Sequence, residues 1–158
     1  MLDSVRAFFK QRMDPTPDPA TSTSARAADI QRLHIAACAL LLELAHADDE
    51  FTSAERSHIE AIMGRHFGLD DETARTLVEL AEAEREQAID LYQFTSLINR
   101  SYDLGQKTLL AEIMWGVILS DGEIARHEGY LLRKIGSLLD LKPGYLAQAR
   151  RSAAANHN

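Results

Sequence analysis

The 158-residue sequence has one cysteine and four prolines, and aromatic residues make up only 6% of it. The single cysteine, Cys38, excludes an intrachain disulfide, as is usual in a reducing cytosol. The longest apolar run, 35–42, has eight residues, whereas a membrane-spanning helix needs about twenty. The first residues also lack the apolar stretch and cleavage site of a signal peptide. These absences favour a cytoplasmic protein.

Basic residues are also scarce: 17 Lys and Arg stand against 24 Asp and Glu, which gives a formal net charge of −7 at pH 7. We expect no nucleic-acid partner, because phosphate binding needs clustered Lys and Arg. The sequence contains no phosphate-binding Gly-rich loop, no Gly-x-Ser-x-Gly and no His-Glu-x-x-His. Cys38 lies in an apolar stretch that raises a thiol pKa and disfavours a nucleophile. We therefore expect a protein that is not an enzyme.

Three of the four prolines fall within residues 14–24, which predicts an extended linker there. The predicted organisation is an N-terminal amphipathic helix, a Pro/Ser/Thr linker, a helical domain and a disordered tail, over 1–13, 14–25, 26–153 and 154–158.

The predicted N-terminal helix has one apolar face, formed by Leu2, Val5, Phe8 and Phe9. A helix of about a dozen residues is marginal alone in water, so we expect it to dock on something. One interpretation is packing on its own domain or on a neighbouring copy, as in a homodimer. The other is contact with a partner or a membrane surface.

Beyond the linker, apolar residues recur every three or four positions, which is the period of α-helices. The stripes occupy 30–44, 59–67, 74–81, 91–102, 109–118 and 131–139. Thr52-x-x-Glu55 is a capping-box pattern, Asp70 precedes a stripe as a cap, and Gly68 follows one as a stop. Pro143 suits the first turn of a final helix. We predict an all-α bundle with about seven helices after the linker.

An acidic motif occurs twice, at 47–55 and at 120–128, with an offset of 73 residues. Both copies read Asp-x-Glu-apolar-x-x-x-Glu, and each lies between two apolar helical stripes. The repeat predicts two helix–acidic turn–helix hairpins, which would pack as a bundle with approximate two-fold symmetry. The sequence alone does not decide whether the two turns are adjacent.

The two motifs supply six candidate metal ligands: Asp48, Glu50, Glu55, Asp121, Glu123 and Glu128. Calcium and magnesium prefer carboxylate oxygens, and a cation relieves the repulsion between clustered negative charges. The pattern is not an EF-hand, because the spacing of a twelve-residue calcium loop is missing. The alternative is a purely structural interaction domain without metal, in which these carboxylates cap helices and close turns.

Histidine offers a rival site. Glu43 with His46, and Glu55 with His58, are both Glu-x-x-His, the pair that helical di-iron sites take from two helices. A helical di-metal enzyme is thus a further alternative, although ferritin-like ligands project from mid-helix whereas these residues lie beside a turn.

Three more side chains are candidates for a functional role. His34 and Cys38 are four residues apart and would suit a soft metal, but such a pair is more often packing, with the cysteine as a small buried hydrophobe. Trp115, near the second acidic motif, is predicted to lie in the core.

The acidic motifs resemble those of the tellurite-resistance protein TerB family. Residues 91–94, 114–115 and 135–139 also resemble these bacterial proteins, so the resemblance to the TerB family covers 30–150. The N-terminal domain of the co-chaperone DjlA is similar. It implies an all-α TerB-like fold, a role in stress or metal-ion responses, and integral membrane partners. One departure is Asp49, where the second copy has Gly122.

From the residues and the resemblance together we expect a stress-response module of bacteria that binds a divalent cation, Ca²⁺ or Mg²⁺, at the acidic turns. We further expect it to dock to a protein partner in a membrane-associated complex. Its expected location is the cytoplasm, including the periphery of the inner membrane.

Overall fold

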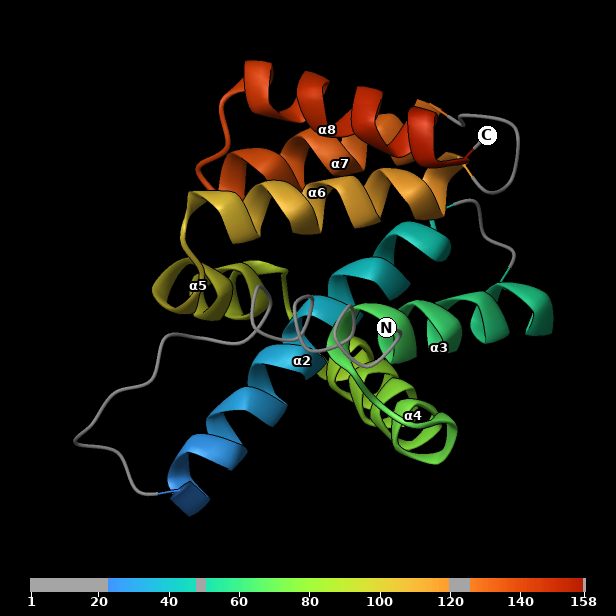
Figure 1. Cartoon of the computed structure of the whole chain (residues 1–158), viewed down its shortest axis with the longest axis vertical. Helices are drawn as coiled ribbons and strands as arrows, with labels where there is room; N and C mark the ends of the chain where they lie inside the picture. Colours follow the sequence, from blue (N-terminus) through green and yellow to red (C-terminus); the bar gives the residue numbers. More distant parts are fainter. Residues whose placement is uncertain (1–22, 48–50, 120–125, 158) are drawn as a thin grey trace, which may run out of the picture.

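The computed structural model describes residues 23–47, 51–119 and 126–157, and in these residues it contains seven helices and no strand (Figure 1). The helices are α2 Thr23–Ala45, α3 Ser53–Phe67, α4 Asp71–Gln87, α5 Tyr92–Ser101, α6 Leu104–Leu119, α7 Arg126–Leu138 and α8 Pro143–His157. The predicted all-α bundle is confirmed, and each predicted apolar stripe belongs to a helix.

Helix α2 is the centre of the bundle and contacts α3, α4, α5, α6 and α7. From Leu33 to Ala45, every residue except Ile35 and Glu43 is buried. A helix that is apolar on all sides is stable only when other elements surround it, and the uninterrupted apolar run 35–42 meets that condition.

Helix α6 is the second buried helix. It packs most extensively against α8 and also contacts α2 and α7. Its buried residues are Leu109, Leu110, Ala111, Ile113, Met114, Trp115, Val117 and Ile118. The first helix of each predicted hairpin is therefore a core helix.

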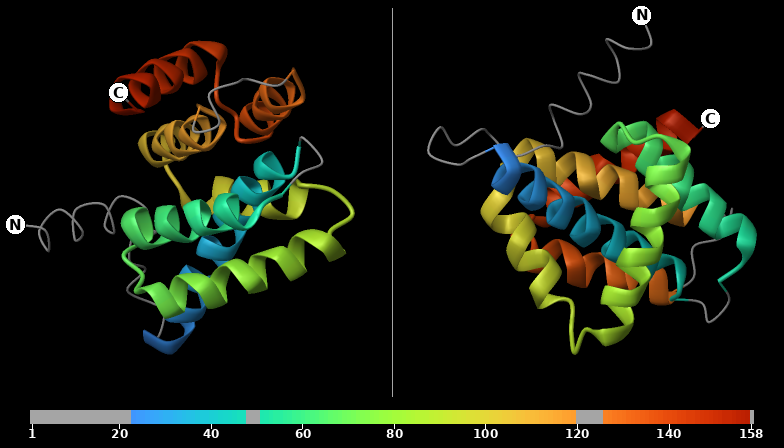
Figure 2. Two further views of the ribbon diagram at one scale, coloured as in Figure 1. Left: turned by 90° about the vertical axis from the view of Figure 1, so that its right-hand side faces the viewer. Right: turned by 90° about the horizontal axis from the view of Figure 1, so that it is seen from below.

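The helix ends that flank the two acidic motifs lie on one side of the bundle. Helices α2 and α3 flank the first motif, and α6 and α7 flank the second. The C-terminal ends of α2 and α6 and the N-terminal ends of α3 and α7 lie on the right in Figure 1, the side that faces the viewer in the left panel of Figure 2. In addition, α2 contacts both α6 and α7, so the two hairpins pack on each other.

Local capping chemistry sets several helix boundaries, as the sequence predicts. The side chain of Thr52 accepts a hydrogen bond from the backbone N–H of Glu55 at 3.1 Å, and α3 begins at Ser53, directly after Thr52. Asp70 accepts the backbone N–H of Thr73 at 2.7 Å, which lowers the pKa of this exposed carboxyl. Gly68 ends α3 with φ 68°, a left-handed conformation that glycine adopts without strain.

Two predicted boundaries differ from the structure. Helix α2 begins at Thr23, inside the linker predicted for 14–25, because the last proline of that segment is Pro19. Helix α8 continues to His157, so the tail predicted as disordered from 154 is helical there; alanine-rich sequence favours helix, and Ala153 is buried. The apolar face of the predicted N-terminal helix (Leu2, Val5, Phe8 and Phe9) lies outside the described residues. Among the described helices, none is long and apolar enough to cross a membrane.

One histidine near the end of α3 has a strongly altered acidity. Burial, and secondarily the charge of Arg65, lowers the pKa of His66 from 6.5 to about 4. Between these two values the unfolded chain binds the proton and the folded chain does not. The contribution of His66 to stability is therefore full above pH 6.5 and is lost as the pH falls toward 4.

We expect the wild-type chain to lose about 2–3 kcal/mol more free energy of unfolding than His66→Gln between pH 7 and pH 4, since one pKa unit corresponds to about 1.4 kcal/mol. Urea denaturation at the two pH values measures this difference. His58→Gln is the matched control, because His58 is exposed on the same helix. An equal pH dependence in the wild type and His66→Gln would contradict the prediction.

Candidate functional site

Most of the predicted metal ligands lie outside the described residues. Asp48, Glu50, Asp121 and Glu123 fall in 48–50 and 120–125, and the side chain of Glu128, a residue of α7, also lies outside the description. The structure therefore places the helix ends that bracket these ligands, and it describes one candidate ligand directly, Glu55.

Glu55 combines a capping role with an accessible carboxylate. Its backbone N–H is capped by Thr52, whose hydroxyl lies 3.2 Å from the Glu55 Oε1 atom and donates to it. The contact is exposed, so water competes for both groups and the carboxylate can exchange this partner for another.

An aromatic contact joins the two sides of the first acidic turn. The ring of His46, just after α2, stacks on the ring of Phe51, just before α3, with centroids 4.2 Å apart and an interplanar angle of 29°. The contact links the residues that precede and follow 48–50. It therefore holds the described ends of this turn close together.

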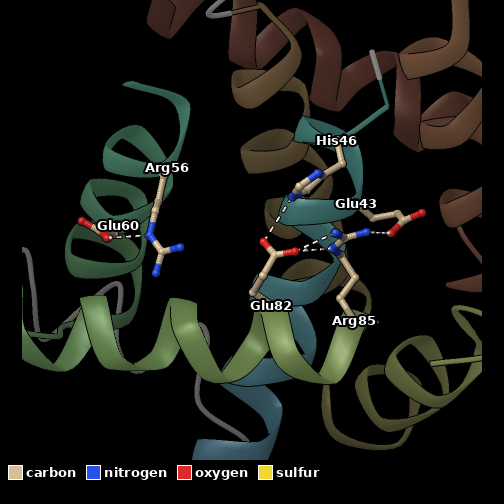
Figure 3. A network of polar contacts seen from close by, with 6 residues as sticks. All are labelled: Glu43, His46, Arg56, Glu60, Glu82 and Arg85. Atoms are coloured by element: carbon tan, nitrogen blue, oxygen red, sulfur yellow. Dashed lines mark hydrogen bonds and ion pairs between the residues drawn. The ribbon is translucent and has the colours of Figure 1, made fainter. Parts of the chain in front are cut away.

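His46 also belongs to a polar network between α2 and α4 (Figure 3). Its Nε2 atom lies 3.1 Å from Oε2 of Glu82 and donates to it in the Nε2–H tautomer. Arg85 donates to the same glutamate at 2.6 Å and to Glu43 of α2 at 3.1 Å. The network ties the end of α2, next to the first acidic turn, to the last turns of α4.

The electrostatics of this network favour charged side chains. Burial of Glu82 by itself raises its pKa, but hydrogen bonds from Arg85 and His46 outweigh burial, and the net shift is downward. Burial likewise disfavours the charge of Arg85, whereas hydrogen bonds to Glu82 and Glu43 raise its pKa overall. Both shifts follow from one arrangement, in which a single guanidinium bridges two carboxylates.

The two Glu-x-x-His pairs do not form a di-metal centre. Glu43 is bound by Arg85 and His46 by Glu82, while Glu55 interacts with its own cap and His58 is exposed. In the described ranges, no three His, Cys, Asp or Glu side chains are grouped in a way that could hold a metal ion. The sequence pattern thus identified residues of a real polar network but assigned them the wrong partners.

The remaining candidates are core residues, as predicted. Cys38 is fully buried, and burial, followed by the negative charge of Glu82, raises its thiol pKa. His34 is 4% exposed and meets the ring of Phe67 edge-on at 4.8 Å. Trp115 is 8% exposed, and the guanidinium of Arg150 lies 5.2 Å from its ring centroid.

Comparisons with known proteins identify one family. The family model described as tellurite resistance protein TerB matches residues 34–151, which include all or part of each of the seven helices. No curated protein and no solved structure matches the chain.

Proposed function

Since this chain belongs to the tellurite resistance protein TerB family, we propose that it is a non-enzymatic stress-response module that binds a divalent cation at its paired acidic turns and docks to a protein partner. The observation that supports this proposal most is the position of the helix ends. The four ends that flank the two acidic motifs lie on one side of the bundle, and the two hairpins are in contact.

The chemistry of the motifs favours a hard cation. Together the segments 47–55 and 120–128 carry seven carboxylates, namely the six candidate ligands and Asp49. Calcium takes six to eight oxygen ligands and magnesium about six, often including water. Bringing several carboxylates together raises their mutual repulsion, and a divalent cation between them offsets it.

The residues just before and just after the first acidic turn are suited to such a site. The stacking of His46 on Phe51 and the bond of His46 to Glu82 restrict the helix ends before binding. Restricting a binding segment beforehand lowers the entropy lost when the ligand binds. The exposed contact of Glu55 with Thr52 leaves that carboxylate able to turn toward a cation.

Docking to a partner is supported by an exposed aromatic side chain. Tyr130 lies in the first turns of α7, close to the second acidic motif, and is 66% exposed. Tyrosine is enriched in protein interfaces, where its ring packs and its hydroxyl remains hydrogen-bonded. We place the partner surface beside the acidic turns for this reason.

The cation proposal is tested by titrating the full chain with CaCl₂ and with MgCl₂. We expect heat in calorimetry, a change in the fluorescence of Trp115, and a rise in the melting temperature. At a metal concentration of 100 times Kd, binding to the folded state adds about 2.7 kcal/mol to its stability. The variant with both Asp48→Asn and Asp121→Asn should lose these effects while keeping its helical content.

The matched control removes the same number of charges elsewhere: Glu84→Gln with Glu86→Gln, both exposed on α4. It should bind the metal as the wild type does. No heat and no melting shift at millimolar metal would overturn the cation proposal and favour a purely structural interaction domain. Binding that survives in the Asp48 and Asp121 variant would show that these residues are not the ligands.

A further inference from the structure

An apolar groove lies on the opposite half of α2 from the acidic turns. It has a volume of about 530 Å³ and is bounded by the N-terminal half of α2, the end of α3 and the first turns of α4. Its apolar walls include Ile30, Phe67, Leu69, Leu77 and Leu80. In liquid water each molecule takes about 30 Å³, so a groove of this size holds many water molecules against apolar side chains.

Leu80 shows that this surface is incompletely covered. It is 41% exposed although it is a large apolar residue in the middle of α4. Covering such a surface with apolar side chains releases the water and is favourable in proportion to the apolar area buried.

We propose that this groove binds the N-terminal segment 1–13 of the same chain. The segment offers an apolar face of suitable composition: Leu2, Val5, Phe8 and Phe9. Amphipathic helices commonly bind in apolar grooves through residues spaced three or four apart. The described helices leave the apolar surface of the groove uncovered, and the apolar residues of the segment match it in composition.

The connecting chain is long enough for this contact. Nine residues, 14–22, separate the segment from Thr23, where α2 begins, and they span up to about 30 Å when extended. The groove starts at Ala27 and reaches His34, about 17 Å from Thr23 along the helix. A tether of this length holds the segment at an effective concentration in the millimolar range.

The charges of the two surfaces are complementary. At the α4 edge of the groove, Asp70, Asp71 and Glu72 are all exposed, and Glu72 lines the groove itself. The segment is mainly basic and contains one acidic and three basic residues: Asp3, Arg6, Lys10 and Arg12. Opposite charges at the rim of an interface orient the partners and accelerate their association.

Docking of the segment in its own groove has a consequence for the rest of the molecule. While Phe8 and Phe9 occupy the groove, they are withheld from a partner protein or a membrane surface. This inference concerns a different site from the acidic turns and does not depend on cation binding.

The test compares amide chemical shifts of the full ¹⁵N-labelled chain with those of a variant in which Leu2, Val5, Phe8 and Phe9 are all replaced by serine. We expect shift changes at groove residues such as Ile30, Leu77 and Leu80. Thr108 and Gln148, which line a separate cavity of α6 and α8, should not change. The substitutions lie outside the helical domain, so they leave its core intact.

Two further variants separate the possible outcomes. Ser4→Ala with Gln11→Ala alters the segment outside its apolar set and should leave the groove shifts at wild-type values. Glu72→Lys should move them toward those of the serine variant, because it reverses a charge at the rim. Unchanged groove shifts in the serine variant would overturn the proposal. Groove shifts that depend on protein concentration would also overturn it, because they would identify a second copy as the occupant.

Discussion

Leu41→Ala is expected to lower the free energy of unfolding by about 2–5 kcal/mol, the range for deleting most of a buried leucine side chain. Leu41 is 0% exposed and lies in the part of α2 that other helices enclose. Rigid helices on several sides restrict collapse around the missing atoms, so we expect a cavity to remain and the loss to fall in the upper half of this range. Urea denaturation at pH 7 measures the change.

Leu104→Ala serves as the comparison, because Leu104 is 47% exposed at the start of α6. Its replacement should cost less than about 1 kcal/mol, since little apolar surface is lost from the core. Leu41→Met nearly conserves the volume and should cost less than about 1.5 kcal/mol. If Leu41→Ala were no more destabilising than Leu104→Ala, α2 would not be the enclosed central helix.

Arg85→Met is expected to cost about 2–4 kcal/mol, somewhat less than the 3–5 kcal/mol typical of breaking a fully buried ion pair. The substitution keeps most of the side-chain volume but leaves Glu82 and Glu43 without their shared cation. The side chains of Arg85 and Glu82 are 17% and 16% exposed, so water compensates poorly for the lost contacts. In the variant, the pKa of Glu82 should rise, because the hydrogen bonds from Arg85 that lower it are gone.

Arg56→Met provides the matched control on α3. Arg56 lies 3.4 Å from Glu60 and 3.8 Å from Glu79, but its side chain is 34% exposed. Arg56 and Glu60 form a partly buried i,i+4 pair on one helix. Pairs of this kind contribute about 0.3–0.5 kcal/mol, so this variant should lose much less stability than Arg85→Met. Adding Glu82→Gln to Arg85→Met should restore part of the lost stability by removing a carboxylate that has lost its guanidinium partner. Equal losses for Arg85→Met and Arg56→Met would contradict the importance of the network.

The features that sequence predicts well here are local ones. Thr52, Asp70 and Gly68 act on backbone groups within a few residues of themselves, so their roles follow from residue type and position. The six apolar stripes likewise predict six of the seven helices, because the helical period is itself local, and Pro143 marks the first turn of the seventh.

The polar network could not be predicted in the same way. Arg85 and Glu43 are 42 residues apart, and His46 and Glu82 are 36 apart. The local sequence of neither segment indicates which residue will be its partner. These residues come together only because α2 packs against α4 in the fold. The i,i+3 pair of Glu82 and Arg85 on α4 can be predicted from the sequence. By contrast, the sequence around Glu43 and His46 suits a metal site equally well, because their partners lie on another helix. The stacking of His46 on Phe51 is a nearer contact, yet it depends on the path of the turn between them.

The central position of α2 has a consequence for how the protein is made. Within the described chain α2 leaves the ribosome first, whereas the helices that surround it, up to α7, follow over nearly a hundred further residues. During synthesis its apolar surface therefore stays exposed until the later helices are made, and exposed apolar surface favours aggregation or binding by a chaperone.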